Sequence, residues 1–147
     1  QWESGNDVAI ARAALSECDA AELEGRMIDE MSGGERKRVE LARVLAGEPE
    51  LLLLDEPLAA LDVSHVQHLA RLLRAVAGQS GRTVVFVAHD LNWSGALASR
   101  MVVMKGGRIL ADGVPAAILG ESLIEEAFGL RARVVEAGGR RWIVPAE

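Results

Sequence analysis

Residues 51–57 read Leu-Leu-Leu-Leu-Asp-Glu-Pro, and this segment gives the strongest indication of the fold. An apolar run this short, ended by two carboxylates and a proline, is typical of a buried strand in a parallel sheet. Residues 83–87, Thr-Val-Val-Phe-Val, predict a second buried strand because they are β-branched and aromatic. Between the two, apolar residues recur at helical spacing from Val66 to Ala77, and Gly78 follows as a stop. Strand, helix and strand in this order predict a right-handed parallel βαβ unit and an α/β fold.

The flanking segments predict helices before this unit and antiparallel hairpins after it. Residues 7–30 read as helical. Ser32, followed three residues later by Glu35, has the capping-box pattern that opens a second helix, which should end at Gly47. The last third of the chain predicts short helices and two hairpins, whose turns are the glycine pairs at 106–107 and 138–139.

The composition excludes several classes of protein. The chain has 147 residues, of which 26% are charged and 50% hydrophobic, and its net charge is −6. Such a chain can bury a core, and its acidic balance argues against a nucleic-acid partner. A single cysteine excludes an internal disulfide framework, and the apolar runs are far shorter than the roughly 20 residues that span a bilayer.

Polar groups follow both predicted strands, where open α/β sheets bind their ligands. Asp55 and Glu56 follow the first strand, and adjacent carboxylates there suit magnesium binding and the activation of water. His89 follows the second strand and could donate a hydrogen bond to a phosphate. Residues Ser32–Gly34 open a helix and could receive an anion at its positive end. Each feature taken alone has an ordinary structural explanation, as a strand end, a turn histidine or an N-cap.

Taken together, these segments resemble the motifs of ATP-binding-cassette ATPases in their order and spacing. Residues 31–46, Met-Ser-Gly-Gly-Glu-Arg-Lys-Arg-Val-Glu-Leu-Ala-Arg-Val-Leu-Ala, resemble the signature motif, and residues 51–57 resemble the Walker B strand. Residues 59–62 resemble the D-loop, and His89 resembles the switch histidine. The resemblance implies an α/β fold with a partial P-loop NTPase-type parallel sheet, a helical signature subdomain and C-terminal antiparallel hairpins. It divides the chain into a helical subdomain (1–50), part of the ATPase core (51–120) and a C-terminal extension (121–147).

The resemblance also implies roles for single residues. Glu56 would be the general base for the attacking water, and His89 would contact the γ-phosphate of ATP. Asp55 would hold Mg²⁺ through water, and Asp62 would couple the two sites of a dimer. The other implied nucleotide-binding residues belong to the signature motif and would serve the ATP of the partner subunit: Ser32, Gly33, Gly34 and Glu35.

The family implies the ATP-binding and hydrolysing subunit of an importer, peripheral on the cytoplasmic face of the inner membrane. Its partners would be a second nucleotide-binding subunit in a head-to-tail dimer, membrane permease subunits and, indirectly, a substrate-binding protein. Residues 87–92 and 128–135 resemble the branch that imports iron-siderophores, haem or cobalamin. The alternative is a family ATPase that acts on ribosomes or chromosomes. Residues 59–62 differ from the Asn-His-Leu-Asp usual in the ribosome class, and residues 1–30 lack the heptads of the chromosome class.

One departure from the family is large, because the sequence contains no G-x-x-x-x-G-K-[ST] phosphate loop. The first residue is also not methionine. We therefore expect the chain to be the C-terminal portion of a cassette, inactive by itself, with apolar sheet faces left exposed. The basic run Arg36-Lys37-Arg38 is expected to be a solvated helix face.

Overall fold

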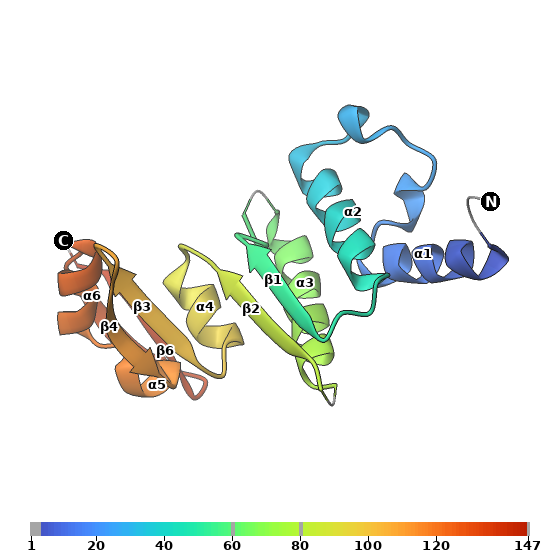
Figure 1. The fold of residues 1–147 in the computed structure, drawn as a ribbon. Helices are drawn as coiled ribbons and strands as arrows, with labels where there is room; N and C mark the ends of the chain where they lie inside the picture. Colours follow the sequence, from blue (N-terminus) through green and yellow to red (C-terminus); the bar gives the residue numbers. More distant parts are fainter. Residues whose placement is uncertain (1–3, 60, 80, 147) are drawn as a thin grey trace. The chain divides into compact units, whose positions relative to one another are not determined.

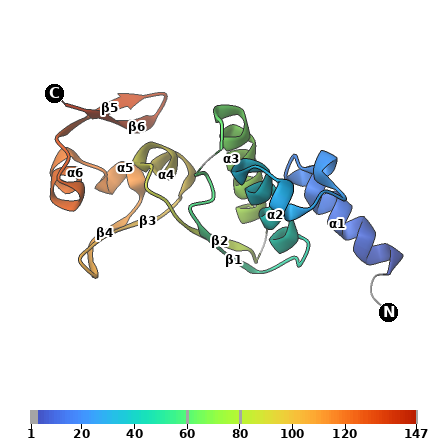
Figure 2. The same cartoon turned by 90° about the horizontal axis from the view of Figure 1, so that it is seen from above.

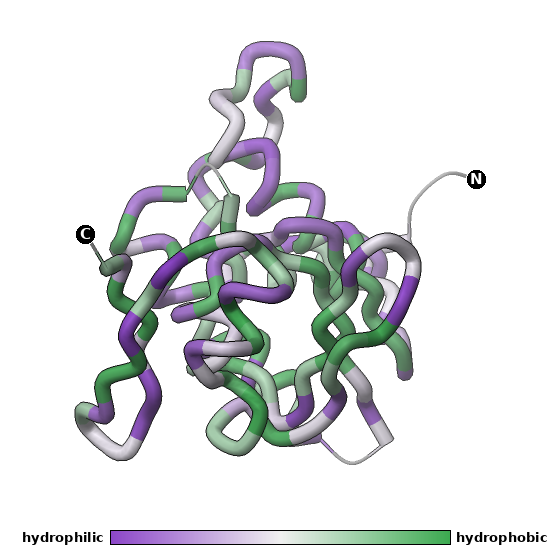
Figure 3. Tube along the Cα trace, turned by 90° about the vertical axis from the view of Figure 1, so that its left-hand side faces the viewer, coloured by the Kyte–Doolittle hydropathy of each residue, from purple (hydrophilic) through white to green (hydrophobic). Residues whose placement is uncertain are grey.

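The structure is a computed structural model that describes residues 4–59, 61–79 and 81–146 (Figure 1). The chain divides into two compact units, Gln1–Ala88 and His89–Glu147. Each unit has its own hydrophobic cluster of buried residues. Hydrophobic and hydrophilic residues interleave along the trace (Figure 3), as expected for elements that bury one face and expose the other. None of the helices within the described ranges is both long enough and apolar enough to cross a membrane.

The first unit opens with helices and continues as a βαβ unit. Its elements are α1 (Gly5–Glu17), two 3₁₀ turns (Ala21–Leu23 and Ile28–Glu30), α2 (Gly33–Leu45), β1 (Leu51–Asp55), α3 (Val63–Ala77) and β2 (Thr83–Val87). Strands β1 and β2 pair in parallel, with Leu52 opposite Val84 and Asp55 opposite Val87. Helix α3 packs on β2 and lies along one face of the strand pair (Figure 2). The predicted βαβ unit is confirmed.

The core of this unit lies between α3, the covered face of the strands, and α1 and α2. Leu52 is fully buried, and Leu73 and Val76 of α3 belong to the same cluster. Since α3 carries its apolar residues on one stripe, that stripe is buried while the opposite side of the helix stays polar.

The other face of the strand pair exposes large apolar side chains. Leu51, Leu53, Val85 and Val87 are 53%, 70%, 49% and 58% exposed. In a strand, successive side chains point to opposite faces, so these residues alternate with the buried ones. The expected exposure of an apolar sheet face is present, and the prediction of two buried strands is therefore wrong for this face.

The prediction of a helical segment over residues 7–30 is wrong in its second half. Helix α1 ends at Glu17, and the chain then makes only 3₁₀ turns. Asp19 has a φ of +53° and Gly25 a φ of +80°, so the backbone leaves the right-handed helical region at both residues.

The second unit contains both predicted hairpins. Its elements are α4 (Leu91–Leu97), β3 (Met101–Lys105), β4 (Arg108–Gly113), α5 (Pro115–Ile118), α6 (Glu121–Phe128), β5 (Ala132–Ala137) and β6 (Arg140–Pro145). Each hairpin turns on a glycine pair with positive φ, which tight antiparallel turns require: Gly106-Gly107 and Gly138-Gly139. Leu119 and Ile124 are almost fully buried in the core of this unit.

Candidate functional site

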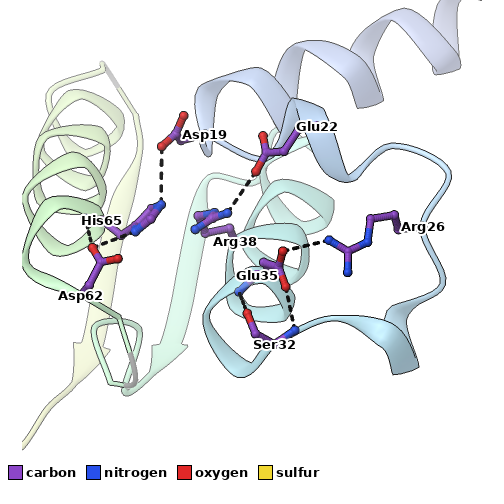
Figure 4. Close-up of polar contacts among 8 residues, drawn as sticks. All are labelled: Asp19, Glu22, Arg26, Ser32, Glu35, Arg38, Asp62 and His65. Carbon is purple, nitrogen blue, oxygen red and sulfur yellow. Dashed lines mark hydrogen bonds and ion pairs between the residues drawn. The ribbon is translucent and has the colours of Figure 1, made fainter.

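The start of helix α2 is a complete capping box (Figure 4). The Ser32 hydroxyl accepts a bond from the Glu35 N–H at 3.3 Å, and the Glu35 carboxylate accepts one from the Ser32 N–H at 2.7 Å. Arg26 donates to the other carboxylate oxygen at 2.9 Å. The Ser32 N–H, the Ser32 hydroxyl and Arg26 together lower the pKa of Glu35 to about 2. The loop that precedes α2 is therefore fixed by the capping box and by Arg26.

Gly33, the first residue of α2, leaves the N-terminus of the helix accessible to a ligand. A Cβ added at Gly33 would meet nothing within 4 Å, so packing inside this chain gives no reason for glycine there. The N–H groups at the first two helical positions, Gly33 and Gly34, have no acceptor within the helix. A phosphate group fits such a terminus, because the backbone can be approached closely and the helix dipole favours negative charge.

The carboxylate pair lies at the carboxyl end of β1, as predicted. Asp55 is exposed and pairs in register with Val87, the last residue of β2. The Glu56 N–H donates to the Val87 carbonyl at 2.9 Å, which joins the ends of the two strands. Glu56 has a φ of +45°, a conformation that glycine adopts more easily. The Glu56 carbonyl accepts bonds from the Ala59 N–H at 3.1 Å and from the Lys37 ammonium.

His89 follows β2 by two residues, so it comes from the strand end to which Glu56 is bonded. It is exposed and is the first residue of the second unit. The structure thus places Asp55 and Glu56 at one end of the parallel pair, and the chain continues from that end to His89.

Asp62 is the N-cap of α3, and its carboxylate is held within the chain (Figure 4). One oxygen, Oδ1, accepts from the His65 N–H at 3.0 Å and from the Ser64 hydroxyl at 2.8 Å, and lies 2.8 Å from the His65 ring. These bonds hold the pKa of Asp62 well below its ordinary value. The other ring nitrogen of His65 lies 3.7 Å from Asp19, just after α1. Ala60, the second residue of the predicted D-loop, is outside the described residues.

The contacts that join α3 and α2 to their neighbours are not among the features predicted from the sequence. His65 lies three residues after an N-cap aspartate, and that spacing is a signal that could have identified the pair. The prediction of a solvated helix face is wrong for Lys37, which reaches the Glu56 carbonyl, and for Arg38, which bonds to Glu22 with only 12% of its side chain exposed. Of the three basic residues, only Arg36 lies on the solvated face as expected.

The donor set fits magnesium in the way the sequence suggests. Among the described residues, no group of three or more His, Cys, Asp or Glu side chains gathers to form a protein-only metal cage. Mg²⁺ does not need such a cage, because it usually keeps several waters and binds one or two carboxylates together with substrate phosphates. The exposed carboxylate of Asp55, at the end of β1, fits that requirement.

Comparison with known proteins agrees with the motifs. Residues 3–59 match the family model described as ABC transporter. The hemin import ATP-binding protein HmuV of Rhizobium meliloti (strain 1021) is 46% identical over 133 residues, which cover 85% of this chain and 50% of that protein. The chain spans about half the length of the curated relatives it matches.

Two solved structures have the same fold. One is a transporter described as of the metal-chelate ABC type, in an inward-facing conformation, with a TM-score of 0.84 and 28% identity over 99% of this chain and 60% of the other. The other is an ATP-binding cassette solved as a dimer in a post-hydrolysis state with ADP and phosphate, with a TM-score of 0.71 and 28% identity over 78% of this chain and 50% of the other. The motifs, the fold and these relatives agree, and the chain belongs to the ATP-binding-cassette (ABC) transporter ATPase family.

Proposed function

We propose that this chain is part of the ATP-binding and hydrolysing subunit of an ABC importer, and that the cargo is haem or a related iron chelate. The observation that carries the proposal is the Asp55-Glu56 pair at the end of β1, joined to the end of β2 by the bond from Glu56 to Val87. The cargo is suggested by the relatives named for hemin import and by the metal-chelate type transporter of similar fold.

The proposed chemistry is hydrolysis of the terminal phosphoanhydride of ATP. Glu56 accepts a proton from the attacking water, and a positioned general base of this kind contributes about 10²- to 10⁴-fold to a rate. His89 donates to the γ-phosphate, and Asp55 would hold Mg²⁺ through a water molecule. When bound, Mg²⁺ would neutralise charge that develops on the phosphate oxygens.

The signature residues serve a second copy of the subunit in this proposal. The ATP held by the partner is bound on its γ-phosphate side by the signature residues of this chain, Ser32, Gly33, Gly34 and Glu35. Asp62 lies between the two sites of a head-to-tail dimer. The related cassette solved as a dimer supports this assembly. The dimer acts on membrane permease subunits from the cytoplasmic face, and a substrate-binding protein delivers the cargo to the permease.

The test is Glu56→Gln in the full-length protein assembled with its permease. The amide cannot accept the proton from water, so we expect ATP hydrolysis to fall about 100-fold or more, while ATP-driven dimerisation is retained. Turnover is measured by phosphate release and dimerisation by sedimentation. The matched control is Glu50→Gln, an exposed glutamate just before β1, which should hydrolyse ATP like the wild type.

Unchanged turnover in Glu56→Gln would show that the base is misassigned. The 147-residue chain alone holds no phosphate-loop sequence and should show no turnover. Haem should stimulate turnover of the assembled transporter more than cobalamin does, and the reverse order would contradict the proposed cargo.

A further inference from the structure

The backbone of Glu56 is held in a conformation that it would not choose by itself. Its φ of +45° lies in the left-handed region, where a side chain crowds the carbonyl oxygen and raises the energy of the backbone. Residues in such conformations persist only when the surrounding structure fixes them. The contacts that fix Glu56 therefore also set the direction in which its carboxylate leaves the backbone.

Hydrogen bonds hold the Glu56 residue on both sides of its Cα. Its N–H donates to the Val87 carbonyl of β2 at 2.9 Å, and its carbonyl accepts from the Ala59 N–H at 3.1 Å. The carbonyl also accepts from the ammonium of Lys37, which lies 19 residues away in sequence. The first two partners belong to the strand pair and the turn after β1, but the third belongs to the signature helix α2.

Lys37 is placed by its helix to make this contact. It is the fifth residue of α2, half-buried, one turn beyond the capping box at Ser32 and Glu35. Its neighbour Arg36 is exposed and pairs with Glu40 at 2.8 Å along the helix. The two side chains are adjacent in sequence and basic, but only that of Lys37 reaches the strand end.

We propose that Lys37 is a positioning residue, which fixes the Glu56 backbone and joins the signature helix to the carboxylate that acts as base. This rests on the proposed function, in which Glu56 activates water at one ATP and α2 begins at the ATP held by the partner. A bond from α2 to Glu56 connects the two sites through one chain. A shift of α2 on ATP binding would change the hydrogen bond from Lys37 that fixes the Glu56 backbone, without any direct contact between Lys37 and nucleotide.

The test compares Lys37→Met with Lys37→Arg in the full-length protein assembled with its permease. Methionine keeps a similar apolar stem and removes the donor, whereas arginine keeps a charged donor of similar reach. We expect Lys37→Met to lower kcat about tenfold with an unchanged KM for ATP, since a hydrogen bond to a charged group is lost. Lys37→Arg should restore at least half of the wild-type kcat, and the control Arg36→Met should behave like the wild type.

A wild-type kcat in Lys37→Met would overturn the inference. A raised KM with unchanged kcat would also overturn it, because that result would indicate contact with nucleotide. A loss of kcat that Lys37→Arg does not rescue would overturn it too, because that result would indicate a structural role only. In a Glu56→Gln background, adding Lys37→Met should cause no further loss, because the group that Lys37 positions is already disabled. A further tenfold loss there would also contradict the inference.

A second readout separates this inference from the proposed function. The ¹³C resonance of the Glu56 carbonyl, labelled selectively, should shift in Lys37→Met and not in Arg36→Met, whether or not the protein hydrolyses ATP. If the wild type shows no turnover that depends on Glu56, the proposed function fails. If that turnover is present and the carbonyl resonance is the same in Lys37→Met and wild type, the inference fails alone.

Discussion

At the scale of single residues, the candidate site depends on a few hydrogen bonds to backbone groups more than on side-chain packing. Glu56 is held at a positive φ by partners from two other elements, and Glu35 and Ser32 hold each other at the start of α2. The capping box could be predicted because both partners lie within four residues of sequence. The bond between Lys37 and Glu56 could not, because local sequence does not say which strand end a helix will pack against.

The capping box gives a prediction about acid stability. The pKa of Glu35 is lowered from 4.5 to about 2, so the ionised carboxylate stabilises the folded state above pH 4.5, and this contribution is lost as the pH falls toward 2. Glu35→Gln should lower the thermal midpoint at pH 7, and the difference from wild type should shrink between pH 4.5 and about 2. Thermal unfolding followed by circular dichroism across this range measures it.

The matched control for the capping box is Glu40→Gln on the same helix. Glu40 is exposed and pairs with Arg36, and exposed pairs of this kind contribute little to stability. A difference between Glu35→Gln and wild type that stays constant from pH 7 to 2 would contradict the assigned role of the carboxylate.

At the scale of elements, β1 divides its four leucines between a core face and an exposed face. Leu52 is fully buried against the cluster that includes Leu73 of α3, while Leu53 is 70% exposed. The sequence shows no alternation, so it predicts a strand buried throughout, which is wrong for Leu51 and Leu53. Only the packing of α3 on one side of the strand pair distinguishes the two faces.

Leu52 and Leu53 form a matched pair for measuring how much burial of a β1 leucine contributes to the free energy of unfolding. Leu52→Ala removes fully buried methyl groups and leaves a cavity, so it should lower the free energy of unfolding by about 2–5 kcal/mol. Leu53→Ala should change it by about 0.5 kcal/mol or less, as exposed substitutions usually do. Urea denaturation of both variants gives the comparison, and equal losses would contradict the assignment of the two faces.

At the scale of the whole molecule, the chain leaves a row of apolar side chains exposed on the strand pair. Leu53 and Val85 are direct cross-strand partners and are 70% and 49% exposed. Exposed apolar patches on strands favour association with other chains. The 147-residue chain should therefore self-associate as its concentration rises.

Replacing that cross-strand pair by opposite charges tests the prediction. The double variant Leu53→Lys, Val85→Glu places a favourable charge pair on the same face and should reduce self-association in sedimentation velocity. The control Leu53→Ile keeps the face apolar and should associate like the wild type. A wild-type chain that stays monodisperse at every concentration would contradict the role of this face.

Four features could be predicted from the amino-acid sequence: the βαβ unit, both hairpins, the capping box and the family of this protein. These features depend on hydrophobic runs, turn glycines and short motifs, which act over a few residues. The folded structure was needed to show where α1 ends, which leucines of β1 are buried, and that Lys37 and Arg38 contact residues outside α2. The reason is physical, because these features depend on contacts between elements far apart in sequence, and those contacts exist only after the chain has packed.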